Sequence, residues 1–137
     1  MRDLRKLKSM LVRHEALKLK PYICPAGKLT IGIGRNLEDK GISFEEADFM
    51  LDNDIHDALR YLRDIFPGFD AFAEGRQDAL IDMAFNLGRQ GFEGFKKTIA
   101  FIKAGEWEAA SMEMLDSKWA AQVGDRATEL SGMIKRG

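Results

Sequence analysis

The stretch KPYICPAGKLTIGIGR, residues 20–35, interrupts a chain whose other segments mostly carry helical periodicity. Pro21 cannot continue a helix, and the β-branched residues that follow favour a second strand after a turn at Pro25-Ala26-Gly27. The stretch therefore predicts a small β hairpin. Gly32 and Gly34 weaken the second strand, which indicates a bend or a place where another group approaches the backbone closely.

Helical patterns lie on both sides of this hairpin. Before it, leucines recur at three- and four-residue steps from Leu4, and we expect this helix to end near Leu19. After it, a capping box at Ser43-Phe44-Glu45-Glu46 opens a long helix that stops at Pro67-Gly68. Four more helical patterns follow, over residues 74–87, 92–104, 106–116 and 125–134.

These elements predict a mainly α fold of the α+β class. With 137 residues, 45% of them hydrophobic, the chain suits one domain able to bury a core. We expect a small lobe at about 15–42 and a linker helix at about 43–66, followed by a helical lobe at about 67–137 that also includes the N-terminal helix. Two such lobes predict a cleft between them, where ligands usually bind.

Charge and cysteine content narrow the function classes. The net charge is −1, but residues 1–35 carry +7 and the remaining residues −8, so any attraction to an anionic polymer would come from the first quarter of the chain. Cys24 is the only cysteine and cannot form an internal disulfide. The N-terminus has no apolar run of signal-peptide length, which predicts synthesis in the cytoplasm without a membrane anchor. His14 and His56 lack metal-ligand spacing, and no nucleic-acid motif is found.

Glu15 is the first candidate for chemistry. It is the only carboxylate between Asp3 and Glu38, and it lies at the end of the first helix, directly before the hairpin. The alternative is a solvated surface glutamate, which is the commoner state of a lone Glu on a helix.

The stretch HEALKLKPYICPAGKLTIGIGR, residues 14–35, resembles the active-site signature of the phage lysozymes, the endolysins of glycoside hydrolase family 24 related to phage T4 lysozyme. In that family a Glu is followed after eight residues by Asp or Cys, after five more by Thr, and then by a Gly-x-Gly turn. Glu15, Cys24 and Thr30 fall at those spacings. The resemblance continues through RQDALIDMAFNLG, residues 76–88, and through the landmarks Ser117 to Trp119, Gln122 and Arg126-Ala127.

The resemblance implies three catalytic residues and no cofactor or metal. Glu15 would protonate the departing glycosidic oxygen, and Cys24, with Thr30 holding a water, would act as base or water-positioner in an inverting reaction. Glu15 must keep its proton near neutral pH, and we expect burial among apolar groups to help it do so. Arg126, whose family counterpart contacts the catalytic Glu, would instead favour loss of that proton.

Other roles are possible for Cys24. A thiol with an ordinary pKa near 8.5 is mostly protonated at pH 7, unless the basic N-terminal segment lowers that pKa. Direct attack of Cys24 on the sugar would instead give a covalent intermediate and retention, and a free cysteine is often only a small buried hydrophobe. A cysteine hydrolase pairing Cys24 with His14 or His56 lacks any accompanying oxyanion or third-residue pattern.

The resemblance also implies substrate-binding residues. Asn86 and Gln122 match residues that line the sugar cleft, and we add Arg126 and Gly34 to this group. We expect Trp119 to pack in the core rather than flank the cleft, and we expect the same of the other large aromatics of this half, Phe85, Phe92, Phe95 and Trp107.

Two departures from the family pattern concern the small lobe. Arg35 follows the Gly-x-Gly turn where relatives commonly carry His, so an ion pair or hydrogen bond of that His would be replaced here. The segment between the hairpin and Ser43 is also shorter than in the longer relatives, which predicts a reduced small lobe.

The function implied is hydrolysis of the β-1,4 bond between N-acetylmuramic acid and N-acetylglucosamine in bacterial peptidoglycan, leading to host cell lysis. The resemblance implies a monomer that accumulates in the host cytoplasm, depends on a holin for access to the wall, and acts in the periplasm. The alternative is a catalytically silent lysozyme-like module that binds peptidoglycan or belongs to a virion.

Overall fold

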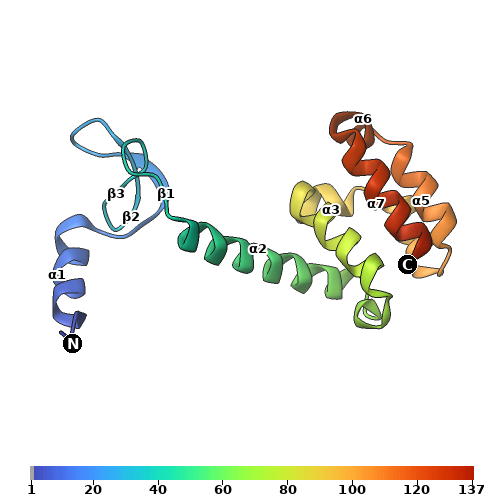
Figure 1. Ribbon diagram of the computed structural model, residues 1–137, viewed down its shortest axis with the longest axis horizontal. Coiled ribbons are helices and arrows are strands. Elements are labelled where there is room, and N and C mark those ends of the chain that lie inside the picture. Colours follow the sequence, from blue (N-terminus) through green and yellow to red (C-terminus); the bar gives the residue numbers. More distant parts are fainter. Residues whose placement is uncertain (1) are drawn as a thin grey trace. The chain divides into compact units, whose positions relative to one another are not determined.

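The computed structural model describes residues 2–137, which are mostly helical with one small antiparallel sheet near the N-terminus (Figure 1). This confirms the mainly α, lysozyme-like class. The chain forms two compact units, the first ending at Phe49 and the second running from Met50 to Gly137. None of the helices within residues 2–137 has the length and apolar character needed to cross a membrane.

The first helix, α1 (Arg5–Glu15), ends earlier than expected, so the prediction of an end near Leu19 was wrong. Ala16 leaves the helix with φ 65° and ψ 157°, and strand β1 (Lys18–Ile23) begins two residues later. Pro21 lies inside β1, where the pairing register shifts between Lys18 and Tyr22, because a proline is tolerated in a strand at such an irregularity.

The sheet has three strands in the order β1-β2-β3 rather than the two of a hairpin. β1 pairs antiparallel with β2 (Leu29–Gly32), and β2 pairs with β3 (Arg35–Asn36). Gly34 has φ +72° and so provides, at no steric cost, the left-handed backbone that the turn into β3 requires. A strand of two residues has no periodicity of its own, which is why the pattern did not reveal it.

The long helix α2 (Phe44–Ile65) begins at the predicted capping box. The Ser43 Oγ accepts a hydrogen bond from the Glu46 amide at 3.1 Å, and the Glu46 Oε1 accepts one from the Ser43 amide at 2.9 Å. Two amide groups that a helix start leaves without partners are thereby satisfied, which confirms this prediction.

The second unit continues with helical elements (Figure 1). They are the 3₁₀ helix η1 (Phe69–Ala71), α3 (Glu74–Glu93), α4 (Lys96–Lys103), α5 (Trp107–Leu115), α6 (Lys118–Val123) and α7 (Asp125–Arg136). Gly88 has φ 74° and ψ 169°, so the helical path is broken where its end was predicted, but helix resumes through Glu93. The six-residue α6 was not predicted.

The core of the second unit lies where α7 packs against α3 and α5. Its largest fully buried side chains are Phe66, Phe69, Phe92, Leu62, Leu80, Met83, Ile102, Met114 and Ile134. Trp119 is buried, as expected, whereas Phe95 and Trp107 are partly buried against the core. The prediction for Phe85 was wrong, because this side chain is exposed.

Candidate active site

Glu15 is the last residue of α1 and faces the turn between β2 and β3. A Cβ atom placed on Gly34 would lie 2.7 Å from the Glu15 Oε2 and 2.9 Å from its Cδ. The turn backbone therefore approaches the carboxyl group as closely as only a glycine allows. The structure thus brings Glu15 and Gly34 together, while the substrate-binding role of Gly34 stays a prediction.

The first unit leaves the Glu15 side chain exposed to solvent, so the expected burial among apolar groups is not found. The reason is local. Every residue of α1 is at least partly exposed, so this helix offers no apolar enclosure at its C-terminal end.

Cys24 directly follows β1, in the turn that leads to β2. Its amide donates a hydrogen bond to the Lys28 carbonyl at 2.9 Å, and its own carbonyl accepts one from the Gly27 amide at 2.8 Å. These two bonds hold the backbone of the cysteine, whose side chain is half-buried. The turn residues predicted from the sequence therefore position the thiol beside the second strand.

The pKa of the Cys24 thiol is lowered from its ordinary value. The main cause is a hydrogen bond from the Lys28 backbone amide, followed by one from the Thr30 hydroxyl, while partial burial acts in the opposite direction. The cause is thus an amide of the turn and a hydroxyl of β2 rather than the basic N-terminal segment. A lowered pKa increases the thiolate fraction, and the thiolate is the form that accepts a proton.

Thr30 is the most buried residue of the sheet region, at 3% exposure, and lies in β2 opposite Tyr22. Its hydroxyl donates to the Lys28 carbonyl at 2.8 Å. Glu15, Cys24, Thr30 and Gly34 thus all belong to the first unit.

Arg35, which stands where relatives commonly carry His, forms an ion pair with Glu46 in the first unit. The Arg35 Nη1 donates to the Glu46 Oε1 at 2.7 Å and to the Gly41 carbonyl at 3.2 Å. The hydrogen bond from Arg35, with further bonds from Ser43, lowers the pKa of Glu46 to about 2. Arg35 therefore ties the end of the sheet to the start of α2.

The other predicted site residues belong to the second unit. Asn86 accepts a hydrogen bond at its Oδ1 from the Trp119 Nε1 at 2.8 Å, which orients the amide. Gln122 lies on α6 and is exposed. The sequence did not predict this bond, because Asn86 and Trp119 are far apart along the chain.

Arg126 pairs with Asp82, which was missed as a site residue. The Arg126 Nε donates to the Asp82 Oδ1 at 2.7 Å. The sequence signal that could have revealed Asp82 is its position as an acidic residue within the otherwise apolar residues 79–84 of α3. Both residues line a pocket of about 310 Å³ in the second unit, together with Leu51, Ile55, Asp78, Ile81 and Phe85.

Within residues 2–137, no group of three or more His, Cys, Asp or Glu side chains is arranged to hold a metal ion. The first unit therefore holds Glu15 at the end of α1 beside the glycine turn, Cys24 directly after β1 and Thr30 in β2. Residues 12–137 match the profile of the phage lysozyme family, and the chain belongs to this family.

Three related proteins extend this comparison. The chain is 31% identical over 132 residues to an endolysin of Acyrthosiphon pisum secondary endosymbiont phage 1, a match that covers 93% of this chain and 86% of the endolysin. It is 30% identical over 156 residues to the pre-baseplate central spike protein Gp5 of Enterobacteria phage T4, covering 93% of this chain and 27% of Gp5. It is also 33% identical over 92 residues to the peptidoglycan hydrolase gp36 of Enterobacteria phage SP6, covering 67% of this chain and 9% of gp36.

Proposed function

We propose that the chain is a muramidase that hydrolyses the β-1,4 bond between N-acetylmuramic acid and N-acetylglucosamine in peptidoglycan. The observation that carries the proposal is the contact of the Glu15 carboxyl group with Gly34, in the same unit as a thiol whose pKa is lowered by Lys28 and Thr30. Membership of the phage lysozyme family supports a glycoside hydrolase.

The reaction follows from an acid and a base in one small unit. Glu15 donates its proton to the glycosidic oxygen as the bond to the anomeric carbon breaks. A water molecule adds to that carbon, and the Cys24 thiolate accepts the proton that the water loses, with Thr30 orienting the water. The thiol then returns its proton to solvent and Glu15 is reprotonated. Direct attack of Cys24 on the sugar remains the minority alternative, and inversion at the product anomer would exclude it.

We propose that the polar residues of the second unit bind the wall polymer. The Asn86 oxygen is occupied by Trp119, so its amide nitrogen is the group available to donate to a sugar oxygen. Gln122 is exposed and suited to the same task, and Arg126 is held by Asp82 at the edge of its pocket.

The biological setting is part of the same proposal. The match to an endolysin over most of both chains supports a role in host cell lysis. We propose that the protein accumulates in the host cytoplasm as a monomer, depends on a holin for release, and acts on the wall in the periplasm.

Muropeptide release from purified peptidoglycan tests the proposal. We expect wild type to release fragments with inverted anomers and Glu15→Gln to be at least about a hundredfold slower, because the variant lacks a general acid. Glu38→Gln is the matched control, since it makes the same change elsewhere in the first unit. Equal rates for wild type and Glu15→Gln would refute the assignment of the acid.

A second candidate function is a silent wall-binding module of a virion. The match to the spike protein Gp5, together with a thiol where many relatives carry a second carboxylate, favours it. Wall binding by wild type without any fragment release would make this candidate the better account.

A further inference from the structure

One side of α1 carries apolar residues that the first unit leaves open to solvent. Leu4, Leu7 and Leu11 recur at steps of three and four residues, so they share one side of the helix. No residue of α1 is buried, and Leu4 and Leu11 are both exposed. Aliphatic side chains that gather on one exposed side of a helix indicate a contact with another apolar surface.

Strand β1 follows α1 closely and adds to this apolar surface. Leu17 lies in the connection between them and is exposed. Within β1, Leu19 is 81% exposed and Ile23 is 63% exposed. β1 is also an edge of the sheet, whose order is β1-β2-β3, so no other strand within residues 2–137 pairs with its outer side. Exposed apolar groups therefore run along residues 4–23.

Basic side chains are interspersed with these apolar groups. Glu15 is the only carboxylate in residues 4–23. Lys8 follows Leu4 by four residues and precedes Leu11 by three, so a positive charge lies on the apolar side of α1 itself. Five exposed basic residues of this segment form no ion pair within residues 2–137: Lys6, Lys8, Arg13, Lys18 and Lys20. The segment therefore presents uncompensated positive charge together with aliphatic groups.

This combination fits a lipid bilayer better than a soluble anionic polymer. Both carry phosphates that attract lysine and arginine, but only the headgroup region of a bilayer also buries aliphatic side chains. Single-stranded nucleic acids instead stack their bases on aromatic side chains, and Tyr22 is the only aromatic residue in residues 4–23. The apolar and the basic groups of this segment thus both find partners at an anionic membrane surface.

We propose that α1 and β1 bind the surface of a bilayer that contains anionic phospholipid. α1 would lie in the plane of the interface, with its leucines in the headgroup region and Lys8 beside the phosphates. Leu19 and Ile23 would add apolar contacts from β1. With 11 residues, α1 is too short to cross the hydrocarbon core, which needs about 20, so this binding is peripheral and reversible.

Co-sedimentation with lipid vesicles tests this binding. The probes are vesicles of phosphatidylcholine with phosphatidylglycerol, and vesicles of phosphatidylcholine alone. We expect the chain to sediment only with the anionic vesicles. Less of it should do so when the salt concentration is raised from about 0.05 M to about 0.5 M, because salt screens the attraction. Polyphosphate, a soluble anionic polymer, should bind more weakly than the anionic vesicles.

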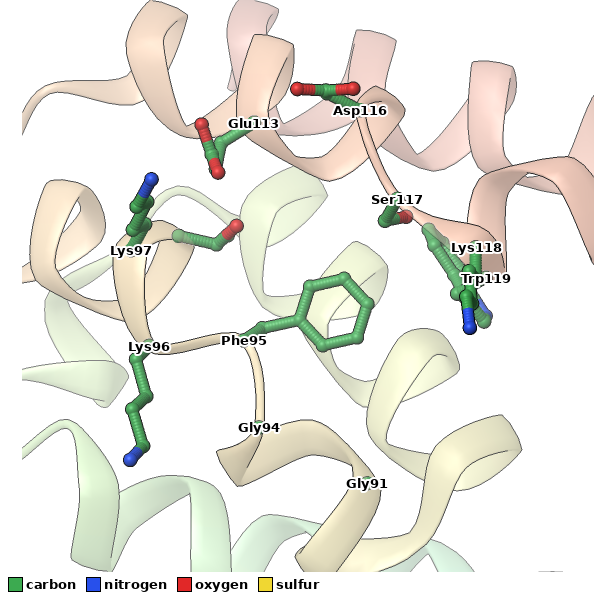
Figure 2. A pocket seen from close by; sticks show the side chains of 11 residues that line it. Gly91, Gly94, Phe95, Lys96, Lys97, Glu113, Asp116, Ser117, Lys118 and Trp119 are labelled. Carbon is green, nitrogen blue, oxygen red and sulfur yellow. The ribbon is translucent and has the colours of Figure 1, made fainter.

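Substitutions with matched controls separate the two parts of the interaction. Lys8→Gln should weaken vesicle binding about fivefold, the contribution of one lysine at an anionic surface. Lys96→Gln should bind like wild type, because Lys96 belongs to the second unit, where it is exposed and directed away from Glu113 (Figure 2). Leu19→Ser should weaken binding about tenfold by removing an apolar contact. Leu115→Ser changes an exposed leucine of α5 and should have no effect.

Three outcomes would overturn the membrane surface as the ligand of residues 4–23. The first is equal sedimentation with both kinds of vesicle, and the second is wild-type binding by Lys8→Gln and Leu19→Ser. The third is tighter binding to polyphosphate, which would assign the positive charge to a soluble polymer. Leu11→Ser should weaken binding as Leu19→Ser does; lower thermal stability with unchanged vesicle binding would show that Leu11 packs within the protein and would remove α1 from the interface. The vesicles contain no glycan, so none of these results depends on the muramidase activity.

Discussion

Replacing Gly34 with alanine tests whether the turn backbone positions the Glu15 carboxyl group. The new Cβ would lie 2.7 Å from the Glu15 Oε2 and 3.0 Å from its Cγ, whereas carbon and oxygen atoms in good contact are roughly 3.5 Å apart. The carboxyl group must therefore move by about 1 Å, and a misplacement of this size can reduce catalysis by about a hundredfold. We expect such a loss of kcat/KM in a turbidity assay on permeabilised Gram-negative cells.

Gly32→Ala is the matched control for this experiment. Gly32 has φ +73°, nearly the same as Gly34, but a Cβ there would have no atom within 4 Å. Both alanines should destabilise the fold by about 1–2 kcal/mol, because both force a side chain into left-handed backbone. Only Gly34→Ala should also lower kcat/KM by about a hundredfold. Equal activity of the two variants, at equal thermal stability, would refute the positioning of Glu15 by Gly34.

Two further predictions concern groups with shifted pKa values. Glu46 has a pKa of about 2 in the folded protein against an ordinary value of 4.5, so the folded state binds fewer protons than the unfolded state. The stability gained from its pairing with Arg35 should therefore be fully present above pH 4.5 and disappear as the pH falls through about 2. Denaturant unfolding of wild type and Glu46→Gln from pH 2 to 7 measures this, and a difference between them that does not change with pH would contradict it. The Cys24 thiol should react with iodoacetamide at a lower pH than an ordinary cysteine, and Thr30→Val should move the profile upward while Thr30→Ser should not. Identical profiles for all three proteins would show that the Thr30 hydroxyl does not act on the sulfur.

Much of the fold was predictable because it rests on local chemistry. The capping box at Ser43 depends on four consecutive residues, and the hairpin on a proline and glycine pattern, so both were visible in the sequence. The end of α1 was not visible in the sequence, because alanine has no propensity for the positive φ that Ala16 adopts. The third strand was missed because its two residues pair only through tertiary structure.

The candidate site was predictable where the signature of the phage lysozymes places the residues. Glu15, Cys24 and Thr30 lie within one short stretch, and the structure places them in one unit with the glycine turn. The partner of Arg126 was not predictable, because Asp82 lies 44 residues away. The physical origin of the lowered Cys24 pKa was likewise not visible in the sequence, since it depends on the Lys28 amide of the turn and the Thr30 hydroxyl of β2.

The conformation of Ala16 also bears on how this enzyme family member can be engineered. With φ 65° and ψ 157°, Ala16 occupies backbone space that is almost reserved for glycine and that destabilises a protein by roughly 1–3 kcal/mol for other residues. This strain is stored at the residue next to the carboxyl group of Glu15. Position 16 is therefore a place where backbone strain lies directly beside the proposed acid, and a β-branched residue is a substitution that this backbone tolerates poorly.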